Sequence, residues 1–152
     1  MIAAQSDKFV SVTPPGALVD NASLTTSTID TAGYAYARVM VYLGATDIAL
    51  TALKVQESDD SGMSGAADVT GLVYGTSNGI SGSASTLPSA TDDNKCFTFE
   101  IDLRGRKRYL DLVATFGDGT AGGYAAAFCL LSRASDSPVS ASERGFGNIL
   151  RV

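Results

Sequence analysis

Residues 34–43, YAYARVMVYL, decide the fold class of this chain. Every second residue from Ala35 to Leu43 is small or aliphatic, and the residues between them are Tyr, Arg or Met. Successive side chains of a strand point to opposite faces, so this period of two predicts a strand with one face in a hydrophobic core.

Five more stretches extend this pattern, and they are residues 48–57, 69–75, 96–103, 108–116 and 124–132. Turn-forming residues separate them, and no amphipathic helix of useful length lies between them. With edge strands near the start of the chain, we expect about seven to nine strands. The sequence therefore predicts an all-β fold, an antiparallel β-sandwich or jelly roll.

The first 33 residues differ in composition from the rest and are rich in Ser, Thr, Ala and Pro. Short apolar alternations at Phe9, Val10 and Val12 and at Leu24 and Ile29 flank a Pro14-Pro15-Gly16 break. We expect residues 1–33 to form an extended N-terminal arm with one or two edge strands, and residues 34–152 to form the sandwich or jelly-roll domain.

Three connections carry specific expectations. The strands at 96–103 and 108–116 meet at a charged corner, which suggests an antiparallel pair, and GDGTAGG at 117–123 predicts a hairpin turn. The stretch 76–94 has few apolar residues, and long loops in compact domains are usually functional. We expect that loop on an exposed rim where it contacts a partner.

The composition limits the function classes. The chain of 152 residues has a formal net charge of −5, which argues against binding nucleic acid. No apolar run approaches the roughly 18 residues of a membrane span, and the first residues lack a signal-peptide layout, so we expect no membrane association and synthesis in a cytosol.

The chain contains no histidine, which excludes Ser-His-Asp and Cys-His catalysis. Cys96 and Cys129 lie in apolar runs and are interpreted as buried free thiols, with a disulfide as the alternative. Two cysteines without histidine cannot complete a four-ligand zinc site. We expect no cofactor and no metal.

Two acidic clusters could indicate a calcium loop or a pair of catalytic carboxylates, namely Glu57, Asp59 and Asp60, and Asp92-Asp93-Asn94. Neither matches the spacing of a calcium-binding loop, and nothing places two carboxylates across one cleft. They are interpreted as solvated loop residues, and the chain is predicted not to be an enzyme; a small hydrolase that uses Asp59 or Asp60 is the opposing hypothesis.

A run of positive charge interrupts this acidic chain at Arg104, Arg106, Lys107 and Arg108. Arginine side chains bind carboxylates in pairs, so the run can form a socket for an acidic patch on a partner. The equal alternative is a solvated corner that its own aspartates, Asp102 and Asp111, neutralise. Tyr34, Tyr36 and Tyr42 share one strand face and favour a core or subunit contact over a sugar-stacking platform.

Three segments resemble small structural proteins encoded beside the capsid genes of tailed bacteriophages. They are VYLGATDIALTALKVQESDDSGMSG, IDLRGRKRYLDLVATFGDGTAGGYAA and LLSRASDSPVSASERG, within residues 39–145. The resemblance is to head decoration or cement proteins, and it implies a β-rich homo-oligomer, a trimer, that binds the major capsid protein on the surface of a virion assembled in the host cytoplasm.

The expected partner contacts are Phe9 and Val10 of the arm, the basic corner Arg104, Arg106, Lys107 and Arg108, and the 76–94 loop. The alternative within the same class is a neck, tail or receptor-binding virion protein whose tyrosine face contacts glycan.

Overall fold

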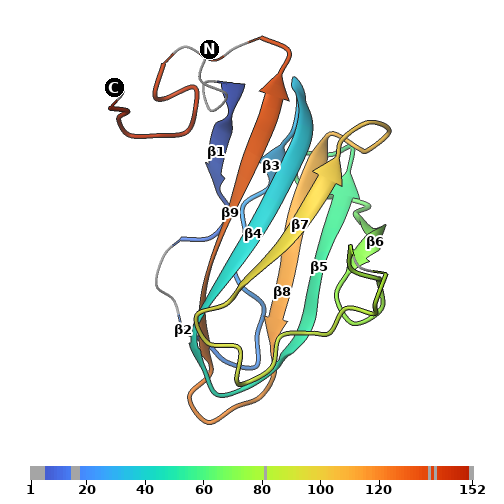
Figure 1. Cartoon of the computed structure of the whole chain (residues 1–152), viewed down its shortest axis with the longest axis vertical. Helices are drawn as coiled ribbons and strands as arrows, with labels where there is room; N and C mark the ends of the chain where they lie inside the picture. The colour runs from blue at the N-terminus through green and yellow to red at the C-terminus, as the bar shows by residue number, and fades with distance from the viewer. Residues whose placement is uncertain (1–5, 15–17, 81, 137, 139, 151–152) are drawn as a thin grey trace.

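The computed structural model describes residues 6–14, 18–80, 82–136, 138 and 140–150. Their strands form two antiparallel sheets packed face to face, with no helix in the described ranges (Figure 1). The predicted all-β sandwich is therefore confirmed.

The described residues form nine strands. Sheet A holds β1 (Lys8–Ser11), β9 (Gly123–Ala134), β4 (Tyr34–Thr46) and β7 (Cys96–Asp102) in that order, and β2 (Leu18–Val19) also pairs with β9. Sheet B holds β3 (Ile29–Asp30), β8 (Tyr109–Phe116), β5 (Leu50–Ser58) and β6 (Ala67–Val73) in that order.

The antiparallel pairs are nested along the chain. The first and last strands pair as β1 and β9, and inside them lie the pairs β3 with β8, β4 with β7, and β5 with β6. A long folded hairpin rolled into two layers has this arrangement, and β4 with β9 and β5 with β8 are the contacts that close the roll.

The core lies between the sheets and consists of every second residue of the long strands. In β4 the buried set is Ala37, Val39, Val41 and Leu43. In β8 it is Leu110, Leu112, Ala114 and Phe116. The strand faces predicted for these two stretches are confirmed, because the alternation of apolar residues directly records which face is buried.

The segment predicted as an N-terminal arm contributes edge strands to both sheets, β1 and β2 to sheet A and β3 to sheet B. Its residues Val12, Leu24 and Ile29 are buried in the core. The backbone of Val12 donates to the carbonyl of Ala127, and Leu24 donates to Ala114. The described part of this segment therefore adds both edge strands and buried core residues to the sandwich.

The predicted pairing across the charged corner is wrong. Strand β7 pairs with β4 in sheet A, and β8 pairs with β5 in sheet B, so the corner crosses from one sheet to the other. The GDGTAGG stretch also makes a crossing, from β8 to β9, and is not a hairpin turn. Apolar alternation identifies the buried face of a strand but does not identify its neighbour, and a few residues span the roughly 10 Å between packed sheets.

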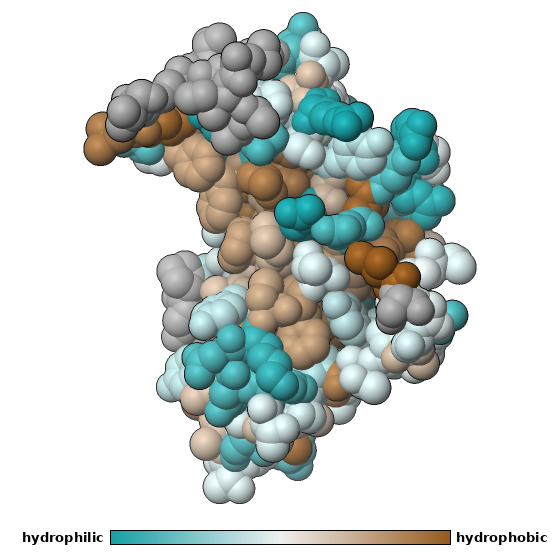
Figure 2. Space-filling model, viewed as in Figure 1, coloured by the Kyte–Doolittle hydropathy of each residue, from teal (hydrophilic) through white to brown (hydrophobic). Residues whose placement is uncertain are grey.

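The outer faces of the two sheets differ in character. Sheet B presents mostly polar side chains, among them Thr51, Lys54, Gln56, Asp111 and Thr115. Sheet A presents apolar and aromatic residues along β9 and β4, and Figure 2 shows the corresponding tan and brown surface along the middle of that face.

Candidate partner-binding sites

The basic corner between β7 and β8 is neutralised within the chain. Each of its four cations forms an ion pair with a carboxylate: Arg104 with Asp102, Arg106 with Glu57, Lys107 with Asp59, and Arg108 with Asp30. Four positive and four negative charges leave a formal sum of zero (4 − 4 = 0). Of the two interpretations left open by the sequence, this geometry matches a corner that carboxylates of the chain itself neutralise.

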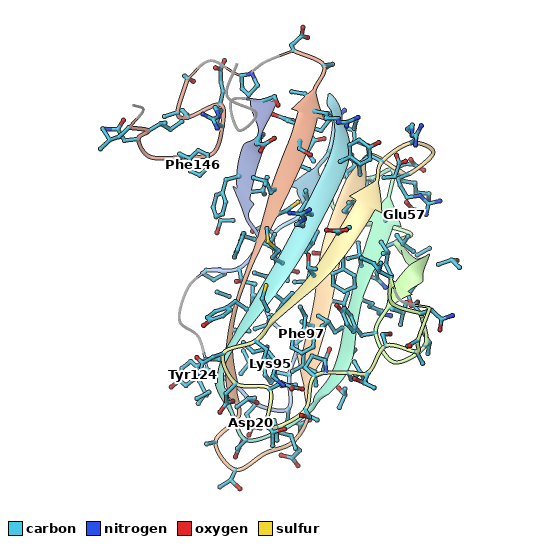
Figure 3. The ribbon with its side chains drawn as sticks, viewed as in Figure 1. Asp20, Glu57, Lys95, Phe97, Tyr124 and Phe146 are labelled. Carbon is cyan, nitrogen blue, oxygen red and sulfur yellow. The ribbon has the colours of Figure 1, made fainter. Side chains whose placement is uncertain are left out.

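Only one of the two aspartates that the sequence suggested as counterions, Asp102, has that role. Asp111 instead accepts a hydrogen bond from the Thr26 hydroxyl at 2.8 Å. The other counterions come from β3 and from the end of β5, far from the corner in sequence. Figure 3 labels Glu57 close to the connection between β7 and β8.

The backbone of the corner is held by the same neighbours. Lys107 N donates to Glu57 Oε2 at 3.1 Å. The Arg108 carbonyl accepts from the Thr31 amide at 3.1 Å and from the Thr31 hydroxyl at 2.7 Å. The corner therefore ties β3, β5, β7 and β8 together and presents a fixed arrangement of charges.

Two of these ion pairs favour the ionised form of their carboxylates. The hydrogen bond from Arg104 lowers the pKa of Asp102 to about 2, and the hydrogen bond from Arg108 lowers the pKa of Asp30. Arg104 keeps 80% of its side chain exposed, so it is the cation of the corner most accessible to a partner.

Phe9 and Val10 point to opposite faces of β1. Val10 is half-buried and packs against the core. Phe9 lies on the outer side, where its ring is 5.6 Å from that of Phe128 and 5.5 Å from that of Phe146. Phe146 lies beside β1 in Figure 3.

The outer edge of β1 is covered by the C-terminal part of the chain. Phe9 N donates to the Arg144 carbonyl at 2.9 Å, and the Arg144 guanidinium donates to the Asp7 carbonyl at 3.1 Å. Residues 140–147 therefore occupy the side of β1 that would otherwise accept a strand from a partner.

Hydrogen bonds and one buried residue hold the second half of the 76–94 loop. Pro88 is fully buried, and its carbonyl accepts from Leu50 N at 3.0 Å. Asp92 accepts from Ser89 N at 2.6 Å, and Lys95 and Ser89 lower its pKa to about 2. Ile80 is 96% exposed, as expected for a loop that projects from the rim.

The sequence did not predict a groove of about 680 Å³ beside this loop. Its walls come from β6, β7 and the loop, and they include Leu72, Tyr74, Asn78, Ile80 and Glu100. The sequence signal for this groove was a large apolar residue, Ile80, in a polar stretch.

The three tyrosines of β4 do not form one platform. Tyr34 is half-buried against the core, and Tyr36 lies under the Arg133 guanidinium, 5.0 Å from the ring centre. Tyr42 is 45% exposed on the outer face. A sugar ring therefore has access to one tyrosine of this set, and the face is better suited to a flat protein contact.

The acidic clusters hold loops in place. Asp60 accepts from Gly62 N at 2.7 Å in the β5–β6 turn, and Asp93 accepts from Thr46 N at 2.9 Å. Asp47 accepts from Thr120 N at 2.9 Å and Ala121 N at 2.7 Å, which lowers its pKa. Among the described residues, no group of three or more His, Cys, Asp or Glu side chains is placed to hold a metal ion.

Both cysteines are free thiols, as the sequence predicted, but only Cys129 is buried. Cys96 is exposed because Phe97, Phe99 and Ile101 take the inward positions of β7. The expectation that Cys96 is buried is therefore wrong.

Comparison with protein-family models, with curated proteins and with solved structures gives no match to this chain. In the part of the chain that the structure describes, no helix is long and apolar enough to cross a membrane.

Proposed function

We propose that this chain is a structural protein of a virus particle, a decoration protein that binds the lattice of the major capsid protein and stabilises the head. The observation that carries the proposal is the nested strand order, β1-β9-β4-β7 over β3-β8-β5-β6. Two Greek keys rolled into eight main strands make a jelly roll, an architecture shared by viral capsid and lectin domains.

The placement of the charged residues supports a mechanical role. Ion pairs at the corner join four strands, and the carboxylates of Asp47 and Asp93 hold the loops at the opposite end. A protein that is rigid at both ends can bridge neighbouring units of a shell without rearranging, so little of its binding free energy is lost to ordering.

A decoration protein stabilises a shell by binding the assembled form and not the dissociated subunits. The surfaces available for this contact are the exposed Arg104 side of the corner and the Ile80 rim. Both are loops at which a sandwich presents residues to a neighbour without disturbing its sheets.

The test is reconstitution. Particles depleted of this protein are heated with and without added purified chain, and release of the genome is followed by dye fluorescence. We expect the added protein to raise the release temperature in a saturable way, and the variants Ile80→Asp and Arg104→Glu to need higher concentrations. Thr70→Asp, on the exposed face of β6, is the matched control. No shift at saturating protein would contradict the proposal.

The groove beside Ile80 favours a second candidate, a neck, tail or receptor-binding virion protein that contacts glycan. Tyr74 and Asn78 in its walls combine an aromatic ring with an amide, a pairing suited to sugars. The copy number of this chain in the virus particle distinguishes the two functions, because a neck or tail protein is present in a few copies and a decoration protein in hundreds.

A further inference from the structure

Among the described residues, no strand or loop covers the middle of the outer face of sheet A. Along β9 and β4 its outward residues are half-buried or exposed, and most are apolar or aromatic. They are Tyr36, Met40, Tyr42, Tyr124, Ala126, Phe128 and Leu130, with Arg38 and Ser132 between them as the polar positions. Phe9 and Phe146 extend it at one end, and the Leu18–Tyr124 pair, 50% and 46% exposed, extends it at the other. The tan and brown band of Figure 2 follows this face. A largely apolar face of this kind marks a contact surface.

We do not expect a partner strand to add to either sheet, because the long edge strands β1, β7 and β6 are protected. The C-terminal segment covers β1 through the bond from Phe9 N to the Arg144 carbonyl. At β7 the Tyr74 hydroxyl donates to the outward carbonyl of Thr98 at 3.0 Å. Strand β6 carries a bulge at its Gly71, whose φ is +91°. These devices hinder edge pairing, so a partner has to meet a face.

The charges on this face indicate which partner fits. The whole chain carries −5, so two copies repel one another at most relative orientations. Within the paired part of β4, β7 and β9, however, the outward face carries Arg38 beside Glu100, 2.9 Å apart. At one end it also carries Asp102, the register partner of Tyr36, whose ring lies under the Arg133 guanidinium. The adjacent cation and anion, Arg38 and Glu100, make the face complementary to itself: across a two-fold axis, each Arg38 can meet the Glu100 of the other copy.

The size of the face is sufficient for such a pair. The outward residues of β9 from Tyr124 to Ser132 extend for about 27 Å at roughly 3.4 Å per residue, and four strands about 4.8 Å apart cover roughly 19 Å. The product is about 500 Å² on each copy, or about 1,000 Å² in total, which reaches the lower limit for a specific interface. The apolar ends at Leu18 and Phe146 add to this area.

We propose that a second copy of this chain covers the outer face of sheet A in a two-fold symmetric dimer. The inference goes beyond the proposed function, since it concerns the purified chain and needs no shell. A contact of a surface with itself joins copies in twos, whereas the trimer implied by the phage resemblance requires two different surfaces.

The first test is sedimentation velocity of the purified chain over a wide range of concentration. We expect a reversible species of twice the 15.6 kDa chain mass. Tyr42→Lys, on the exposed part of the face, should weaken dimerisation at least tenfold without changing the circular dichroism spectrum. Val113→Lys, at a half-buried outward position of sheet B, is the matched control and should leave the dimer intact.

The second test reverses the charges. Arg38→Glu places two anions side by side on the face and Glu100→Arg places two cations side by side, so each variant alone should be monomeric and their equimolar mixture should form a heterodimer. A wild type that is monomeric at every concentration would overturn the proposal. A trimer would also overturn it. So would an equal loss of dimerisation with Val113→Lys and Tyr42→Lys, or a loss of shell binding in Tyr42→Lys while the wild type stays monomeric.

Discussion

The guanidinium of Arg108 binds the carboxylate of Asp30 through two hydrogen bonds of 2.8 Å, from Nε to Oδ1 and from Nη2 to Oδ2. This pair joins the connection between the sheets to the edge strand β3, which has only two residues. A short edge strand makes few ladder hydrogen bonds, so a fork of two charge-assisted bonds contributes a large share of what holds it.

Asp30→Asn should lower the unfolding temperature at neutral pH and have a much smaller effect in acid. The pKa of Asp30 is lowered in the folded protein, so its contribution to stability is present above the unfolded value, near 3.8, and is lost as the pH falls through the lower folded value. Thermal unfolding of the variant and the wild type at pH 7 and pH 2 tests this. Asp118→Asn, on the exposed β8–β9 connection, is the control. An equal difference at both pH values would show that the effect does not come from the ion pair.

Gly145→Ala should detach the C-terminal segment from β1. Gly145 has φ of +77°, and a Cβ there would collide with the Phe9 carbonyl oxygen. We expect destabilisation by more than about 1 kcal/mol and faster hydrogen exchange at Phe9, whose amide donates to Arg144. Gly147→Ala, with open space at the Cβ position, should change neither quantity. Unchanged exchange at Phe9 in Gly145→Ala would contradict this account of the edge.

Thr13→Val should destabilise the protein by about 1–3 kcal/mol, because it leaves a buried donor without an acceptor. The Thr13 hydroxyl oxygen accepts from Ala127 N at 2.7 Å, in the buried interior beside β9. Urea unfolding measures the change. Thr70→Val, on the exposed face of β6, makes the same chemical replacement and should stay within about 0.5 kcal/mol of wild type. Equal effects of the two substitutions would refute the assignment.

One of the two thiols should react in the native protein. Cys96 is exposed, whereas burial raises the pKa of Cys129 to about 12 and keeps it protonated. In dilute solution at pH 8, a thiol reagent should modify one group rapidly and the second only after denaturant is added. Cys96→Ser should abolish the rapid reaction, and Cys129→Ala should leave it. Rapid native modification of the Cys96→Ser variant would contradict the described burial.

The sequence predicted the long strands and their buried faces because alternation acts locally. The inward residues of β4, such as Val39 and Val41, and those of β8, such as Leu110 and Leu112, were identified correctly. Strand neighbours were not, since the same alternation at the corner suits a hairpin within one sheet and a crossing between two. The inward face of β7 likewise determines that Cys96 is exposed, although the surrounding apolar run suggested burial.

The candidate site depends on contacts between residues that are distant in sequence. The sequence therefore indicated the cations of the corner but not most of their counterions. The basic corner was recognisable as a run of charge, but three of its counterions lie 48 to 78 residues away: Asp30, Glu57 and Asp59. Phe9 was recognisable as an apolar residue of a predicted edge strand. The segment that covers this edge comes from the other end of the chain, so no local pattern could indicate it.

The position and copy number of this chain in purified virus particles decide whether it is the decoration protein that we propose. Cryo-electron microscopy with quantitative mass spectrometry should show a β-sandwich of this strand order on the outer surface of the head, in a number that scales with the major capsid protein. One or a few copies per particle, a position away from the head shell, or absence from the particle would contradict that proposal.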